Sequence, residues 1–383
     1  MLEGVNLPAK NIILYNPKAG DFLNRLSILN LAGRAGRLLK DYYGKIYCIN
    51  IKDWELKEEI FDDKLEEVKS SSEIVLTEES DNLVKYLKDD NYSCLSRVEG
   101  LATSLIIKYL TYSNTEFLYK YKEKYEKISL DALVQIEQLI KEICTNFEGL
   151  DKEIILKNKS VDPRFQYRLY NEIMRKKTVI VLPSPEKYKN ESKSYYDIIY
   201  PVFNDIYKYL LKKEDNGYRY FSWLASVWLM ETSYKSILEN KISRGELRAN
   251  ESEKAFINRM IEDLDDNIES DLKYEFSKGL KCYIDIANYC MSKIGYETTI
   301  CKELPTLLEA GACSKRTLFL MEAGFSRTSA IKISEIMEED KETISEYISW
   351  IQNNMTLLKE KIPNILYEEI KNVIDTNQVR IDL

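Results

Sequence analysis

The chain has 383 residues with only 13 glycines and 8 prolines, a composition that indicates a mostly helical protein. Its net charge of −8 excludes a uniformly basic protein that coats nucleic acid, although a local basic channel stays compatible with it. The complete absence of histidine excludes Ser-His-Asp and Cys-His catalysis, HExxH sites and Cys/His zinc fingers, and we expect no metal site.

The cysteines and the apolar runs indicate a cellular compartment. Seven cysteines are scattered singly, which is typical of a reduced chain rather than a disulfide scaffold. The first ten residues, MLEGVNLPAK, lack the pattern of a signal peptide. The longest apolar run, FSWLASVWLM at 221–230, has half of the roughly 20 residues that a membrane span needs. We therefore expect a cytoplasmic protein without membrane contact.

The first fifty residues predict one corner of an α/β domain. The run NIILYN (11–16) is apolar and β-prone, and KIYCINI (45–51) is a second strand of the same kind. Phe22, Leu26 and Leu29 recur between them at helical spacing. NLAGRAGR (30–37) follows, with two arginines that each come directly after a glycine. Its glycines let a ligand come close to the backbone, and its planar guanidinium groups suit the binding of phosphate.

Residues 71–180 predict a small helical or winged-helix-like domain, beginning near the serines at 70–72. Its last helix, VDPRFQYRLYNEIM, continues into a basic end. Aromatic side chains alternate there with five cations: Arg164, Arg168, Arg175, Lys176 and Lys177. This alternation can bind a single strand through phosphate contacts and stacking, with Arg164, Arg168, Lys176 and Lys177 as the candidates. The simpler alternative is a solvated helix face with buried aromatic side chains.

Residues 181–300 predict a bundle of long helices after the linker LPSP (182–185). One apolar stripe in 267–291 is expected to pack in its core, as are Trp223 and Trp228. The members of the stripe are Ile268, Leu272, Phe276, Leu280, Ile284, Ala287 and Met291.

Residues 301–383 predict a helical C-terminal domain. The sequence EAG occurs at 309–311 and again at 322–324, which predicts two helices that end at glycines. LMEAGFSRTSAIKI resembles a helix-hairpin-helix, with Arg327 as a further nucleic-acid-binding candidate, although Ser326 occupies the place of an expected glycine.

Two stretches together resemble motifs V and VI of superfamily 2 helicases: LEGVNLPAKNIILYNP (2–17) and FLNRLSILNLAGRAGRLLKDYYGKIYCI (22–49). The similarity is to the Ski-like DExH branch, which includes bacterial phage-defence helicases of the Hachiman type. The motif order, the strand between the motifs and their spacing all match. The resemblance covers residues 2–51 and implies a partial second RecA-like domain over 1–70.

The resemblance also implies a set of site residues. In such helicases, two RecA-like domains hold ATP and Mg²⁺ between them. Gly4 and Asn6 of motif V would lie near the nucleotide, with Asn30 and Gly33 beside it. Arg34 and Arg37 would be the catalytic motif VI arginines that face the triphosphate. Asn30 stands where relatives carry Gln or His, and its amide can still donate a hydrogen bond.

The chain departs from such helicases in what it lacks. No GxxxxGK[ST] phosphate loop and no DExH box occur in the 383 residues. The sequence therefore predicts the C-terminal part of a longer helicase, inactive alone, whose partners are the missing N-terminal half, single-stranded DNA or RNA, and a nuclease. The alternative is a non-enzymatic helical module that binds nucleic acid or protein.

Overall fold

The computed structural model describes residues 11–15, 18–19, 21–22, 28, 45–49, 69–189, 195–296 and 299–381. It is mainly α-helical, as the composition predicts. The chain divides into two compact units, Met1–Lys69 and Ser70–Leu383, which are described separately below.

The first unit contains two small sheets. Strand β1 (Asn11–Tyr15) pairs in parallel with β4 (Lys45–Ile49), so that Ile13 lies opposite Tyr47. Strands β2 (Lys18–Ala19) and β3 (Asp21–Phe22) form a short antiparallel pair. Both longer strands were predicted from the sequence, and a parallel pair requires a crossover connection between its members. Two described residues fall in the helix predicted over 22–29: Phe22 lies in β3 instead, and Ile28 is helical and buried.

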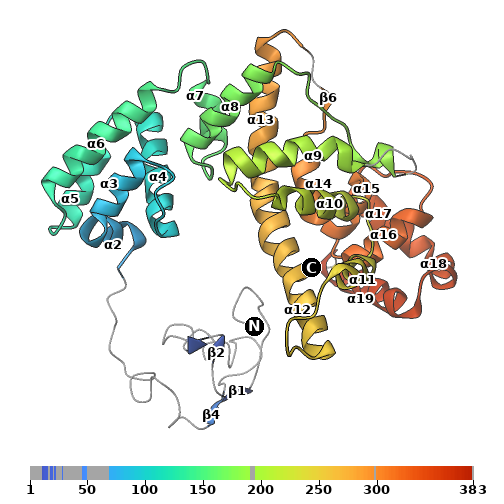
Figure 1. Ribbon diagram of the computed structural model, residues 1–383. Helices are drawn as coiled ribbons and strands as arrows, with labels where there is room; N and C mark the ends of the chain where they lie inside the picture. The colour runs from blue at the N-terminus through green and yellow to red at the C-terminus, as the bar shows by residue number, and fades with distance from the viewer. Residues whose placement is uncertain are drawn as a thin grey trace. The chain divides into compact units, whose positions relative to one another are not determined.

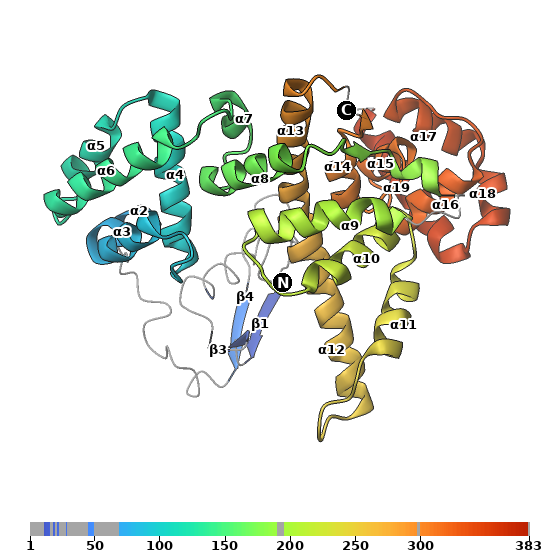
Figure 2. The same ribbon diagram turned by 45° about the horizontal axis from the view of Figure 1, so that its top comes forward.

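The second unit begins with a helical subdomain (Figures 1 and 2). Its core comprises sixteen buried residues between Val75 and Ile140. Residues 69–180 contain no strand, so the predicted domain is helical and lacks the β-wing of a winged helix. The elements are α2 (Ser71–Glu78), α3 (Ser80–Lys88), α4 (Ser96–Tyr112), α5 (Glu116–Lys124) and α6 (Leu130–Thr145).

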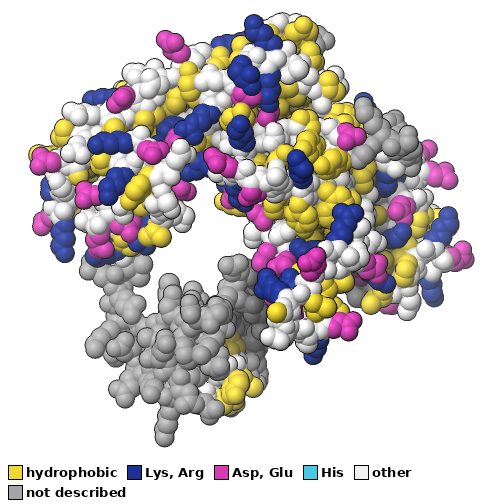
Figure 3. Space-filling model, in the orientation of Figure 1, with side chains coloured by type: hydrophobic (Ala, Val, Ile, Leu, Met, Phe, Trp, Pro, Cys, Tyr) yellow, Lys and Arg dark blue, Asp and Glu magenta, His cyan; other side chains and the backbone are white. Residues whose placement is uncertain are grey.

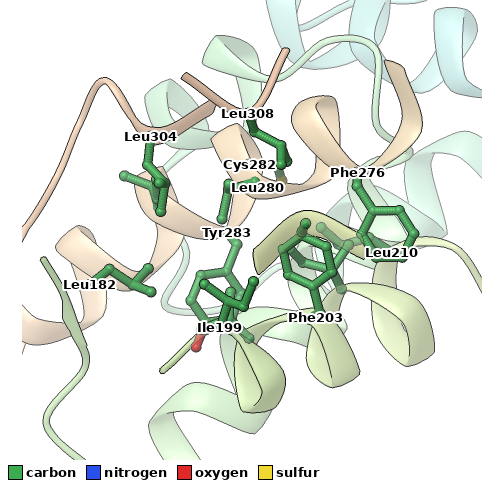
Figure 4. Packing of buried hydrophobic residues seen from close by; sticks show 14 of the residues in the cluster. Leu182, Ile199, Phe203, Leu210, Phe276, Leu280, Cys282, Tyr283, Leu304 and Leu308 are labelled. Atoms are coloured by element: carbon green, nitrogen blue, oxygen red, sulfur yellow. The ribbon is translucent and has the colours of Figure 1, made fainter. Parts of the chain in front are cut away.

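A larger central core extends from Ile107 to Ala312 (Figure 4). The predicted boundaries at 180 and 300 both fall inside it, because helices on either side of each boundary contribute to the same apolar interior. Its elements are α7 (Lys152–Lys157), α8 (Pro163–Lys176), β5 (Val181–Leu182), η2 (Pro185–Tyr188), α9 (Tyr195–Asp205), η3 (Ile206–Leu210), α10 (Gly217–Leu229), α11 (Tyr234–Arg244), α12 (Glu253–Asp266), η4 (Asn267–Phe276), α13 (Ser277–Lys293), β6 (Thr299–Ile300) and α14 (Leu304–Ala310).

The longest feature of this core is the continuous column formed by α12, η4 and α13 (Figure 1). All seven residues of the predicted stripe are buried, each no more than 4% exposed. From Ile268 to Ile284 they recur every four residues, whereas an α-helix has about 3.6 residues per turn. The π-helical segment η4 widens the turns, and this keeps the stripe facing the core.

The C-terminal helices have their own core, from Leu320 to Ile374. The two predicted glycine ends are confirmed: Gly311 follows α14 with φ of 69°, and Gly324 follows α15 with φ of 102°. The helices are α15 (Lys315–Glu322), α16 (Arg327–Ile336), α17 (Ile344–Asn353), α18 (Met355–Lys361) and α19 (Asn364–Ile381).

Candidate nucleic-acid interface

The predicted nucleotide-site residues lie outside the part of the chain that the structure describes. They are Gly4, Asn6, Asn30, Gly33, Arg34 and Arg37. The described strands β1 and β4 flank the segment that carries the arginine loop. The geometry of a site can therefore be built only in the second unit, from the basic candidates.

Arg164 is a structural residue of α8. Its side chain is 9% exposed, and its guanidinium donates to both carboxylate oxygens of Asp162, at 3.1 and 2.8 Å. A third bond, of 2.8 Å, reaches the carbonyl oxygen of Tyr86, whose ring also lies under the guanidinium. The Asp162 carboxylate offsets the burial of the cation and raises the pKa of Arg164. Arg164 therefore ties α8 to the end of α3 and is closed to a nucleic-acid strand.

The more exposed cations of α8 are matched by carboxylates. Arg168 places one guanidinium nitrogen 2.6 Å from both oxygens of Asp90. Lys176 lies 2.7 and 2.9 Å from the oxygens of buried Asp205. Lys177 ends the helix in a left-handed conformation with φ of 49° and is exposed. The predicted alternation of aromatic and basic residues is present, but most of its charge is neutralised within the fold.

Arg327 is also committed to internal contacts. Its guanidinium donates to the carbonyl oxygens of Gly311 (2.7 Å), Trp228 (2.9 Å) and Thr232 (3.1 Å). It stacks on the Trp228 ring, 3.9 Å from the ring centroid. Burial lowers the pKa of Arg327 to about 10, so the group stays charged at neutral pH. Arg327 joins the C-terminal helices to the central core.

In the hairpin formed by α15 and α16, a carboxylate binds the backbone amide where α16 begins. Glu369 of α19 accepts from the Ser326 amide at 2.9 Å and from the hydroxyl groups of Ser326 and Ser329. In a hairpin that binds nucleic acid, these donors would face a backbone phosphate. The path of the chain therefore resembles a helix-hairpin-helix, but a carboxylate of the same chain occupies the position where a phosphate would bind.

A basic cleft that the sequence analysis missed lies between α7, α13 and residues 295–296 and 302–306. It has a volume of about 980 Å³. Three lysines line it, Lys157, Lys281 and Lys302, together with a single carboxylate, Asp285. Figure 3 shows Lys and Arg side chains over α7, α8 and the end of α13, with carboxylates between them.

The charge of this cleft is largely uncompensated. The Asp285 carboxylate accepts a 2.9 Å bond from Asn158, whereas the Lys281 ammonium donates to the carbonyl oxygen of Lys157 at 3.0 Å. Among the described residues, neither Lys157 nor Lys302 forms an ion pair with a carboxylate. Two tyrosines also line the cleft, Tyr289 and the 53% exposed Tyr296. Lysines and aromatic rings around an open cleft suit a single strand.

A sequence signal for this cleft exists on α13. Lys281, Asp285 and Asn288 recur at spacings of four and three, which places them on one helix face. The apolar stripe of the same helix lies on a different face, among the buried core residues. Lys157 and Lys302 lie more than a hundred residues from each other, so no local pattern links them.

Two other kinds of feature, a metal-binding cluster and a membrane-spanning helix, were sought among the described residues. No group of three His, Cys, Asp or Glu that could hold a metal occurs among the described residues. In the same part of the chain, no helix combines the length and apolar character of a membrane span. The chain matches no protein-family model, and no curated protein matches it.

Proposed function

We propose that this chain supplies the arginine-bearing half of an ATP site in a superfamily 2 helicase or translocase. The proposal rests on the order of two motif-like stretches, each of which contains one strand of a parallel pair. Residues 2–17 and 22–49 resemble motifs V and VI, and strands β1 and β4 within them pair in parallel. A RecA-like corner requires that topology, since its strands are joined by crossover helices.

The exposure of the strand pair supports the same assignment. Ile13 and Tyr15 of β1 are 64% and 67% exposed, and Tyr47 and Ile49 of β4 are 49% and 42% exposed. Parallel sheets are normally buried on both faces. These side chains therefore suit a sheet that packs against further RecA-like structure.

In this proposal Arg34 and Arg37 neutralise the charge that develops on the transferred phosphoryl group. Phosphoryl transfer depends mainly on positioning and charge stabilisation, and an arginine supplied across the cleft is worth about 10³–10⁵ in rate. ATP and its Mg²⁺ would also contact a segment with a phosphate loop and an acidic box, which the 383 residues do not contain. Phage defence and a nuclease partner stay predictions from the resemblance.

The nucleic-acid strand would contact the basic cleft of the second unit. The cleft carries three lysines against one carboxylate, and two tyrosines can stack on bases. Phosphate contacts and stacking give binding that tolerates sequence and weakens with salt. The cleft replaces α8 as the proposed interface, because most of the α8 cations have internal partners.

The proposal is tested on the complex that forms in the source cells. The tagged chain is isolated with its native partners, and ATP hydrolysis is measured with and without single-stranded nucleic acid. We expect Arg37→Ala to lower kcat by at least about 10²-fold, given the range for arginines of this kind. Arg37→Lys should restore little activity, because an ammonium cannot reproduce the planar fork.

Arg97→Ala is the matched control, since Arg97 is a surface arginine that pairs with Glu79 in the second unit. Its turnover should equal that of the wild type. A complex without ATP hydrolysis, or equal turnover for Arg37→Ala and Arg97→Ala, would refute the enzymatic proposal and favour a non-enzymatic binding module.

A further inference from the structure

A second cavity, of about 430 Å³, lies between the end of α8, the segment 178–183 and α9. Its volume falls in the range of about 300–1,000 Å³ that is typical of small-molecule sites. Its walls are mostly apolar, and two of the valines are about half exposed, Val179 at 47% and Val181 at 52%. The apolar lining residues are Ile173, Val179, Ile180, Val181, Pro183, Ile198, Pro201 and Val202.

One polar group that lines this cavity is open to a ligand. Tyr283 of α13 is 4% exposed and lines the cavity, and its hydroxyl forms no hydrogen bond with any described residue. Figure 4 shows the side chain extending from α13 toward α9, with its oxygen beside Ile199. Burial and the charge of Asp205 raise the pKa of Tyr283, which keeps the hydroxyl protonated. A tyrosine hydroxyl that faces the cavity without a partner among the described residues can donate a hydrogen bond to a ligand or accept one from it.

The charges around the cavity determine which ligand fits. Two carboxylates line it, Asp197 and Asp205, against one cation, Lys176. The Lys176 ammonium is already shared between Asp205, at 2.7 Å, and Glu172, at 3.4 Å. Asp197 is exposed and has no ion-pair partner among the described residues. An anionic ligand would therefore meet an excess of negative charge, whereas a protonated amine would reduce it.

We propose that this cavity binds a small organic amine, with its apolar body against the valine, isoleucine and proline walls and a hydrogen bond to the Tyr283 hydroxyl. The site is independent of the basic cleft, which has the opposite sign of charge and shares none of its lining residues. It is also independent of the proposed ATPase, since no nucleotide or nucleic acid takes part.

The test uses the full chain and tryptamine as the probe, with ligand-observed NMR and a titration. We expect a dissociation constant of about 1 mM or tighter, as for a fragment of this size. Indole-3-propionate, a similar indole with a carboxylate in place of the amine, should bind at least about tenfold more weakly because of the negative charges. No tryptamine binding, or equal binding of the two compounds, would overturn the proposal.

Two variants locate the binding. Tyr283→Phe removes only the hydroxyl and should weaken tryptamine about tenfold, with an unchanged or higher melting temperature, because no hydrogen bond is lost on folding. Ile198→Trp fills the cavity and should abolish binding. Unchanged affinity in either variant would show that the amine binds elsewhere and would overturn the proposal.

Discussion

The helix α8 and the basic cleft both carry several cations, but they differ in where their carboxylates lie. On α8, Arg164 and Arg168 contact Asp162 and Asp90. In the cleft, three lysines face one aspartate, which is itself bound to Asn158. A basic sequence pattern therefore predicts charge, whereas the paired carboxylates decide how much of that charge a ligand can use.

Of the α8 cations, Arg164 should contribute most to the stability of the fold. Replacing Arg164 by alanine leaves the Asp162 carboxylate, which is 3% exposed, without its cation, whereas Asp90 keeps Arg168 at 2.6 Å. Breaking a buried pair in this way costs about 3–5 kcal/mol. We expect a loss of that size in the free energy of unfolding, measured by denaturant titration.

Arg168→Ala is the matched variant. The Arg168 side chain is 44% exposed, and when it is removed Arg164 still lies 3.9 Å from Asp90. The destabilisation should therefore be clearly smaller than for Arg164→Ala. If Arg164→Ala left stability unchanged but weakened nucleic-acid binding, the difference drawn between the two regions would be wrong.

The cleft should show the opposite behaviour. In Lys157→Ala/Lys302→Ala, two exposed ammonium groups are lost that pair with no carboxylate among the described residues. Each phosphate contact with a single strand contributes about 0.7 to the slope of log K against log salt, so the slope should fall by about 1.4. Binding of a labelled oligonucleotide at several salt concentrations measures it.

Lys235→Ala/Lys332→Ala is the control for this experiment, because both lysines are exposed on other helices, α11 and α16. Its salt dependence should match that of the wild type, and both double variants should unfold at the wild-type denaturant concentration. Equal slopes in all three proteins would mean that the cleft does not contact the strand.

Local patterns predicted much of the fold. The stripe from Ile268 to Met291 could be identified because apolar residues on one helix face recur regularly. The helix ends at Gly311 and Gly324 followed from the left-handed conformation that glycine allows. The strands 11–15 and 45–49 were short apolar runs of the expected kind.

The candidate sites could be predicted far less well, because their partners are distant in sequence. Arg164 contacts Tyr86, 78 residues away, and Arg327 contacts Trp228, 99 residues away. No periodic pattern within α8 or α16 predicts these contacts. The cleft lysines likewise come together only in the folded chain, and the residues of the arginine loop lie outside the described part.

The smallest effect is expected at Arg175, the most exposed cation of α8. Its side chain is 72% exposed, and its guanidinium donates to both oxygens of Glu172 at 2.8 and 3.0 Å and holds the pKa of that carboxyl at about 2. Ion pairs that involve an exposed side chain contribute little to stability, because water screens them. Arg175→Ala should therefore leave the denaturant midpoint of unfolding close to that of the wild type and leave nucleic-acid binding unchanged.

The contribution of the Arg175–Glu172 pair to stability should depend on pH in one direction only. A carboxyl whose pKa is lower in the folded than in the unfolded chain stabilises the fold above its unfolded pKa, about 4.3 for Glu. That stability is lost as the pH falls from there toward 2, the folded value. NMR titration should show the Glu172 pKa rising toward its usual range in Arg175→Ala, with Lys176, 3.4 Å away, retaining part of the shift. An unchanged Glu172 pKa would show that Arg175 and Glu172 do not form an ion pair in solution. Only the α8 cations that contact buried carboxylates would then be neutralised.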